Sequence, residues 1–464
     1  GTSNFRAGVN AGNSIASGGT FNVAVGDESG TAITTGDHNV AVGYESLKTE
    51  DAHGHNTAVG SQALKTLNAG ADGKNTAVGA FAGKLMTEGV QNTLIGGLAG
   101  DALTHADFNT VVGYQALSAD TFGHRSTAIG YSALNAQNFA SSTNSSNTAV
   151  GYHSGLSVST GIRNTIIGSE AGDALTDADD NVAIGALALS ADRKGNKATA
   201  IGRGALKVQD FSSSTDSNNT AVGYSAGESV TTGQFNTILG SFCGDGIVTG
   251  TRNTALGFNA LSGAVDDGNY NTCIGADAGL VTTGSQNTFV GGYDPSTGGS
   301  GEAMTTGSKN TILGSYNGNQ GGLDIRTADN NIVLSDGDGN PRNFIGSTGT
   351  TSLSETAGIG RFGSSQGISV ADDATVTVNA PSKSAGGYII TVYDTAGGTG
   401  GCFYATFRGG TTLIAEGISG DCANADTDGK LCVFKTSGAH TITFKNRMGG
   451  TKTFFIGCYA AHII

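Results

Sequence analysis

The sequence predicts an all-β protein in which a parallel β-roll or solenoid shaft of 17-residue coils is followed by a C-terminal antiparallel β-sandwich or barrel knob. The phrase Asn-Thr-Ala-Val-Gly and its near variants occur 18 times from Asn22 to Asn331, and ten of the 17 spacings are 17 residues. Such a short fixed period is typical of a solenoid, whose coils bury apolar side chains against their neighbours. With 77 Gly, 3 Pro and 13% charged residues, the composition favours stacked β structure over disorder.

Four segments follow from this pattern. Residues 1–21 precede the first phrase and form a lead-in segment, and residues 22–345 form the shaft. The spacings lengthen after Asn287, and a Gly/Ser/Thr-rich connector occupies 346–367. From residue 368 to 464 the texture changes to short β-type runs separated by Gly/Asp turns, which predicts a separate tip domain.

Within each repeat, counted from its Asn as position 0, three positions are nearly invariant. Position 4 is Gly in 17 of 18 copies, position 3 is always aliphatic, and position 2 is Ala in ten copies and a larger apolar residue in most others. Neighbouring residues of a strand point to opposite sides, so both sides must be covered. We expect position 3 to face the interior of the coil and position 2 to face another copy of the chain.

These positions supply the candidate site residues. The structural repeat residues are Asn75, Val78, Gly79, Asn147, Val150, Gly151, Asn219, Val222 and Gly223. The residues expected to pack between chains are Leu94, Ile166 and Ile238, which occupy position 2. Stacked Asn side chains are expected to hydrogen-bond one another at strand spacing, and the position-4 Gly is expected to adopt positive φ.

A longer period overlies the short one. Position 8 alternates between Gly and Leu with a period of four coils, and coil lengths of 17, 17, 17 and 21 repeat from Asn75 to Asn219. This indicates a 72-residue super-repeat whose fourth coils carry surface loops. We expect two short strands and two turns per coil, and 17 intervals at about 4.8 Å give a rod of roughly 80 Å.

The tip is expected to contain seven strands. They are predicted at 369–378, 388–393, 402–407, 411–415, 431–435, 440–445 and 452–459. Aromatic residues concentrate there and favour a packed core, while the loops 394–401 and 417–429 are the expected recognition loops. The sequence leaves the pairing of Cys402, Cys422, Cys432 and Cys458 open; Cys243 and Cys273 take small apolar slots of the repeat and are expected to be buried thiols.

Several function classes find little support. The formal net charge is −14 without a basic run, which argues against nucleic acid, and no run of 18 apolar residues exists to span a membrane. G-x-S-x-G phrases occur at Gly223–Gly227 and Gly363–Gly367, but neither stands at the strand–helix turn that a nucleophile needs. We therefore expect no enzyme activity and no cofactor.

Two sets of residues raise the question of a metal. Asp336-Gly-Asp-Gly-Asn340 resembles the start of a calcium loop but lacks the closing Glu, because Ser347 stands there; an Asp/Gly turn is the simpler interpretation. His53 and His55 could present two imidazoles on one side of a strand. Only one such pair occurs, and we predict no metal site.

The repeat resembles the head repeats of trimeric autotransporter adhesins, which are left-handed parallel β-rolls, although those repeats are shorter. The runs Thr306–Gly314, Tyr316–Arg326 and Asn330–Arg342 look like the shaft-end segment of phage tail fibres, especially marine ones. This resemblance covers residues 20 to 345 and implies a homotrimer. It implies a virion tail fibre, structural and receptor-binding, that attaches to a glycan or protein of a bacterial host surface and joins other tail components, outside the cell. The alternatives are a bacterial cell-surface trimeric adhesin lacking its anchor and a structural extracellular filament.

Overall fold

In the computed structural model the chain is described at residues 3–263, 267–296 and 298–349, and beyond them at the strands given below together with Arg447. Past residue 349, side chains are placed only for Val433, Phe444, Lys445 and Arg447. The described residues contain strands, turns and irregular segments and no helix. Two compact units divide the chain at Gly1–Thr283 and Gly284–Ile464.

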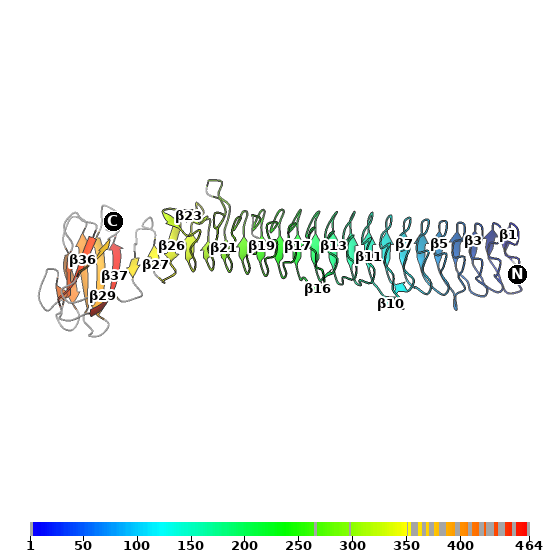
Figure 1. Cartoon of the computed structure of the whole chain (residues 1–464), viewed down its shortest axis with the longest axis horizontal. Helices are drawn as coiled ribbons and strands as arrows, with labels where there is room; N and C mark the ends of the chain where they lie inside the picture. Colours follow the sequence, from blue (N-terminus) through cyan, green and yellow to red (C-terminus); the bar gives the residue numbers. More distant parts are fainter. Residues whose placement is uncertain are drawn as a thin grey trace. The chain divides into compact units, whose positions relative to one another are not determined.

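Unit 1 is a β-solenoid. Its repeat phrase forms three-residue strands that pair in parallel and in register with the strand one coil away, so that Thr148 aligns with Thr165 and Ala149 with Ile166. Figure 1 shows these strands stacked along the unit. They are β1 (Phe5–Ala7), β2 (Val23–Val25), β3 (Val40–Val42), β4 (Thr57–Val59), β5 (Thr76–Val78), β6 (Thr93–Ile95), β7 (Thr110–Val112), β9 (Thr127–Ile129), β11 (Thr148–Val150), β12 (Thr165–Ile167), β13 (Val182–Ile184), β15 (Thr199–Ile201), β17 (Thr220–Val222), β18 (Thr237–Leu239), β19 (Thr254–Leu256) and β20 (Thr272–Ile274).

The stack begins before the first repeat phrase. β1 lies within the lead-in segment and pairs in parallel with β2, and the side chain of Asn4 accepts the backbone N–H of Asn22 at 2.8 Å. The lead-in therefore already forms a coil. From β1 to β20, fifteen intervals at about 4.8 Å make unit 1 about 70 Å long.

The expected orientation of the strand faces was wrong. Leu94, Ile166 and Ile238 at position 2 are fully buried within their own chain, so they cannot pack against another copy. Val150 at position 3 is half-buried, and Ile167 is 36% exposed. Position 2 thus fills the narrow interior of the coil, where Ala fits in most copies, and position 3 points outward.

The outward residues include two further predicted structural residues. Val78 is 37% exposed and Val222 is half-buried. Sequence alternation correctly separates positions 2 and 3 onto opposite sides, but it does not say which side is the interior.

The position-4 glycines have the expected positive φ, and close packing explains why they are Gly. The φ angles of Gly79, Gly151 and Gly223 are 138°, 141° and 142°. A Cβ placed on Gly151 would lie 2.7 Å from the carbonyl carbon of Gly168 in the next coil. The backbone turn at this position therefore excludes any side chain, both by conformation and by contact.

The Asn residues form a ladder along unit 1, but their side chains bond mainly to backbone groups, and side-chain bonds between Asn residues occur only at some rungs, such as Asn164 to Asn147 at 3.3 Å. The backbone N–H of Asn164 donates to Oδ1 of Asn147 at 2.8 Å, and the Nδ2 of Asn147 donates to the carbonyl of Gly161 at 2.8 Å. Asn75 and Asn219 occupy equivalent rungs. Each buried Asn therefore satisfies backbone groups of neighbouring coils that would otherwise lack partners.

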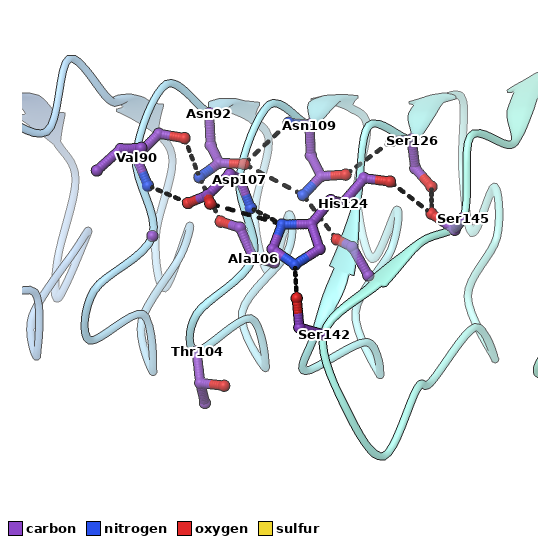
Figure 2. Close-up of polar contacts among 12 residues, drawn as sticks. Val90, Asn92, Thr104, Ala106, Asp107, Asn109, His124, Ser126, Ser142 and Ser145 are labelled. Atoms are coloured by element: carbon purple, nitrogen blue, oxygen red, sulfur yellow. Dashed lines mark hydrogen bonds and ion pairs between the residues drawn. The ribbon is translucent and has the colours of Figure 1, made fainter.

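A second polar ladder runs beside the first, and Figure 2 shows both. The backbone N–H of Val90 donates to Asp107 at 2.8 Å, and the N–H of Asp107 donates to Nδ1 of His124 at 3.0 Å. The His124 ring then contacts Ser142 through Nε2 at 2.8 Å. One super-repeat further on, Asn196 accepts the N–H of Asp179 in the place of His124.

The 72-residue super-repeat corresponds to a repeating pattern in the sizes of the side chains that fill the interior of the coils. Ile166 at position 2 lies against Gly172 at position 8 of its own coil and against Gly155 at position 8 of the preceding coil, where a Cβ would lie 3.0 Å from Ile166. In the coils of Ala128 and Ala200 a buried Leu fills position 8. In the coils of Ala149 and Ala221, each followed by a coil with Ile at position 2, position 8 is Gly. Large and small residues exchange places from coil to coil, which keeps the narrow interior filled.

The coils contain fewer second strands than we expected. Among the described residues of unit 1, a second strand appears only as β8 (Gly123–His124), β10 (Thr143–Asn144), β14 (Gly195–Asn196) and β16 (Thr215–Asp216), which form two parallel pairs, β8 with β10 and β14 with β16. The remaining coils turn without a second strand. Their backbone groups bond to the next coil, as when the N–H of Leu47 donates to the carbonyl of Ala63 at 3.0 Å.

Unit 2 begins with the same parallel stacking and then changes to antiparallel pairing. β21 (Thr288–Val290), β22 (Thr311–Leu313) and β25 (Ile332–Ser335) are parallel, whereas β26 (Pro341–Ile345), β27 (Thr351–Leu353) and β28 (Arg361–Gly363) follow as antiparallel neighbours. Ser335 stands where the other copies have Gly, and there the strand continues into a bulge. A hairpin of β23 (Asn319–Gln320) and β24 (Leu323–Asp324) covers Tyr316, whose hydroxyl lies 2.8 Å from the carbonyl of Leu323.

The C-terminal residues form further strands at most of the predicted positions. They are β29 (Ile368–Val370), β30 (Thr375–Asn379), β31 (Gly387–Asp394), β32 (Gly400–Thr406), β33 (Thr411–Glu416), β34 (Cys422–Ala423), β35 (Leu431–Phe434), β36 (Thr441–Asn446) and β37 (Lys452–Ala461). β31 pairs with β32 and β37, while β30, β36, β35 and β34 form a second sheet. The run predicted at 369–378 is divided between β29 and β30. The sandwich or barrel closure of the knob stays a prediction.

Candidate functional site

A continuous apolar surface of unit 1 consists of the position-3 side chains, which we call the outer column. Its members in unit 1 are Val25, Val42, Val59, Val78, Ile95, Val112, Ile129, Val150, Ile167, Ile184, Ile201, Val222, Leu239, Leu256 and Ile274. Every member is half-buried or exposed, with Ile95, Leu239 and Leu256 between 40% and 46% exposed. Because neighbouring strands are in register, these side chains form one continuous stripe at coil spacing.

Aromatic rings stack two residues beyond the column. The rings of Tyr114, Tyr131 and Tyr152 at position 5 are stacked, with centroids 5.9 and 5.6 Å apart. Each of the three is 46–49% exposed. Their faces lie against one another, so the outward parts are ring edges and hydroxyls, which is a poor platform for stacking a sugar.

Buried polar groups interrupt the interior near two of the fourth coils, where Ser126 and Ala198 replace the ladder Asn. Gln137 spans this gap, since its Oε1 accepts from Asn147 at 2.8 Å and its Nε2 donates to Asp120 at 2.6 Å. Backbone N–H groups of Gly123 and Phe139 also donate to Asp120. Burial raises the pKa of the Asp120 carboxyl, with these donors acting in the opposite direction.

The same arrangement recurs 72 residues later. The Nε2 of Gln209 donates to Asp192 at 2.6 Å, and its Oε1 accepts from Asn219 at 2.8 Å. Burial likewise raises the pKa of Asp192. Both carboxyls are fully buried within satisfied networks, so they serve the continuity of the coil and are not accessible to a substrate.

A third buried acid, Glu50, belongs to a cluster that could hold a metal. One ligand atom each from Glu50, Asp51 and His53 lies within 4.8 Å of the others. Glu50 is fully buried, and burial raises the pKa of its carboxyl. Among the described residues, this is the one such group of three or more His, Cys, Asp or Glu side chains.

The His53/His55 pair considered from the sequence does not act together. The Nδ1 of His53 lies 3.6 Å from Glu50, whereas the ring of His55 stacks on His38 at 5.2 Å and its Nδ1 lies 3.5 Å from Asp72. Sequence reasoning missed the acids beside His53. The available signal was the recurrence of an acid at position 11 in the third coil of three successive super-repeats.

The Asp336–Asn340 loop is an Asp-capped turn. The Asp336 carboxylate accepts the backbone N–H groups of Asp338 and Asn340, and it forms an ion pair with Arg342. These contacts hold the pKa of Asp336 below its usual value. Because Arg342 already neutralises the carboxylate, the turn interpretation fits the contacts better than a calcium loop does.

The two shaft cysteines are free and buried, as the sequence predicted. Burial raises the pKa of Cys243 to about 12 and also raises that of Cys273. The side chains of Cys402, Cys422, Cys432 and Cys458, and most of the loops 394–401 and 417–429, lie outside the described residues.

Known proteins supply no further identification. Comparison with protein-family models, curated proteins and solved structures gives no match for this chain. Among the described residues, none forms a helix with the length and apolar character needed to cross a membrane.

Proposed function

We propose that this chain forms a homotrimeric attachment fibre in which the outer columns of three copies pack against one another. The observation that carries the proposal is the outer column itself. A continuous aliphatic stripe of this extent is unusual on a surface that stays in water. Burying about half of each aliphatic side chain would contribute on the order of 1 kcal/mol per coil and per chain.

The spacing of the column favours a second copy of the chain as the partner. A surface that covers the stripe must offer apolar side chains at the same rise for its whole length. A parallel copy of the chain offers apolar side chains at this spacing, because its coils have the same rise. Three copies rather than two are favoured by the resemblance of the repeat to trimeric adhesin heads.

Attachment is the biological role we propose for this fibre. The run from Asn330 to Arg342 resembles the shaft end of phage tail fibres, which favours a virion fibre that binds a bacterial surface glycan or protein. Neither the column nor the stacked rings form a site for chemistry, and we propose no catalytic activity. The recognition loops would be those of the C-terminal tip, which is proposed to be a knob of antiparallel strands.

Immunogold labelling tests the attachment role. Antibodies raised against the chain should label fibres at the tail of virions in a phage preparation, and soluble chain should reduce the adsorption of the same phage to its host. Labelling of a bacterial surface without virions would support the adhesin instead. Unlimited filaments from purified chain would support the structural filament, and either result would overturn the tail-fibre proposal.

A further inference from the structure

Three coils of unit 1 carry a buried acid at the same place, which is position 11 of the third coil in three successive super-repeats. These are Glu50, Asp120 and Asp192, all fully buried. In each case a backbone N–H from position 13 of the next coil donates to the carboxylate, from Ala69, Phe139 and Phe211 respectively. The three sites are therefore equivalent by position and differ by their neighbours.

Glu50 lacks the Gln side-chain amide that donates a hydrogen bond to each of the other two acids. Gln137 and Gln209 donate to Asp120 and Asp192 at 2.6 Å, whereas the equivalent residue beside Glu50 is Leu67. Glu50 receives only two backbone N–H groups, from His53 and Ala69, each at 3.2 Å. A buried carboxylate with fewer donors calls for another source of compensation.

The neighbours of Glu50 are different as well. Position 14 is Gly123 or Gly195 in the equivalent coils, where a Cβ would collide with the Asp side chain, but it is His53 beside Glu50. Position 12 is Asp51, where the other coils have Thr121 and Arg193. An imidazole and a second carboxylate are thus added only where the amide donor is missing.

The Nδ1 of His53 lies at ion-pair distance from this carboxylate. This nitrogen is buried and has no hydrogen-bond partner, and it lies 3.6 Å from Oε1 of Glu50. Neighbouring ligands of a tetrahedral cation lie about 3.3–3.6 Å apart when the metal–ligand distances are about 2.0–2.2 Å. The separation between Nδ1 of His53 and Oε1 of Glu50 agrees with this spacing. The Asp51 carboxylate lies within the same 4.8 Å group and completes three protein ligands.

We propose that Glu50, Asp51 and His53 bind a divalent transition-metal cation, with one nitrogen and two oxygen ligands and water in the remaining positions. This donor set suits Zn²⁺. The cation compensates the buried Glu50 charge, a task that the Gln side chains perform in the equivalent coils. Since Glu50 also bonds Ala69, the ion would tie two successive coils near the N-terminal end of the solenoid.

Zn²⁺ binding to the full chain tests this proposal. After dialysis against a chelator, isothermal titration with ZnCl₂ should show one Zn²⁺ per chain and a raised melting temperature. His53→Ala and Asp51→Asn should each weaken binding by at least about tenfold, the lower end of the effect of ligand-shell changes. The matched controls His55→Ala and His105→Ala remove imidazoles outside the cluster and should bind as the unaltered chain does.

Two results would overturn the proposal. One is absence of stoichiometric Zn²⁺ uptake by the unaltered chain, which would mean that Glu50 and His53 form a direct ion pair only. The other is equal weakening in the cluster variants and in the control variants. Asp51 is partly exposed, so the Asp51→Asn variant is expected to stay folded. It still tests the proposal if the His53→Ala variant fails to fold.

Discussion

At the residue scale, the solenoid depends on a few positions where only one residue type fits. Gly151 turns the chain at a φ of 141° directly beneath the carbonyl of Gly168. Asn147 links three coils through its side chain. It accepts an N–H from Asn164 and donates to the carbonyl of Gly161 and to Gln137. These requirements come from the stacking of one coil on the next, which explains why they recur with the coil period.

Gly151→Ala should destabilise the solenoid by at least about 2 kcal/mol. The reason is that a non-Gly residue in this backbone region costs roughly 1–3 kcal/mol, and the contact with Gly168 adds to that. Thermal unfolding followed by circular dichroism measures the change. Gly70→Ala is the matched control, because a Cβ there meets nothing within 4 Å. Equal melting temperatures for the two variants would contradict the packing argument.

The conformation and the hydrogen bonds of a residue could be predicted where a local rule applies. Which face of a strand is buried could not be predicted. Positive φ at Gly79 and hydrogen bonding along the Asn positions follow from general properties of Gly and Asn. The burial of Ile166 and the exposure of Ile167 did not follow, because alternation fixes opposite sides without naming the interior. Covariation of volume was the missing signal: Leu94, Ile166 and Ile238 at position 2 are each accompanied by Gly at position 8 of their own coil and of the preceding coil, whereas position 3 stays aliphatic throughout.

At the element scale, the four-coil super-repeat allows loops to be inserted while the coils stay regularly stacked. Two fourth coils have Ser126 or Ala198 in place of the ladder Asn. Gln137 and Gln209 connect the ladder across these gaps while bonding to a buried Asp. The sequence predicted the period from position 8 and from the coil lengths. It could not predict this network, because the three side chains come from different coils and are brought together only by stacking.

The buried acids predict a specific pH dependence. Burial raises the pKa values of Asp120 and Asp192, so the folded state favours their protonated forms more than the unfolded state does. Their contribution to the free energy of unfolding is therefore fully present below the ordinary Asp pKa of about 3.9 and is lost as pH rises through the raised folded values.

Melting temperatures of the unaltered chain and of the double variant Asp120→Asn, Asp192→Asn measure this effect between pH 4 and 8. The stability difference, unaltered chain minus variant, should fall with rising pH and then level off. Comparison of the two proteins cancels the titration of other acids. Parallel curves over the whole range would show that these two carboxyls do not titrate differently on folding.

At the scale of the whole molecule, the outer column is the surface on which the proposed assembly depends. Fifteen aliphatic side chains of unit 1 face outward in one line, and each of them is half-buried or exposed. Assembly with identical chains gives every coil the same partner surface at the same rise. The resemblance to phage and adhesin fibres is consistent with such an assembly.

The molar mass in solution tests this central claim most directly. Light scattering coupled to size exclusion should give three times the 46.1 kDa chain mass for the unaltered protein. The triple variant Ile95→Asp, Ile167→Asp, Leu239→Asp should give the mass of one chain with its β circular dichroism retained, because charges would enter a dry interface. Leu85→Asp with Val208→Asp alters equally exposed apolar side chains away from the column and should leave the trimer intact. A folded, unaltered protein that measures 46.1 kDa would contradict the account.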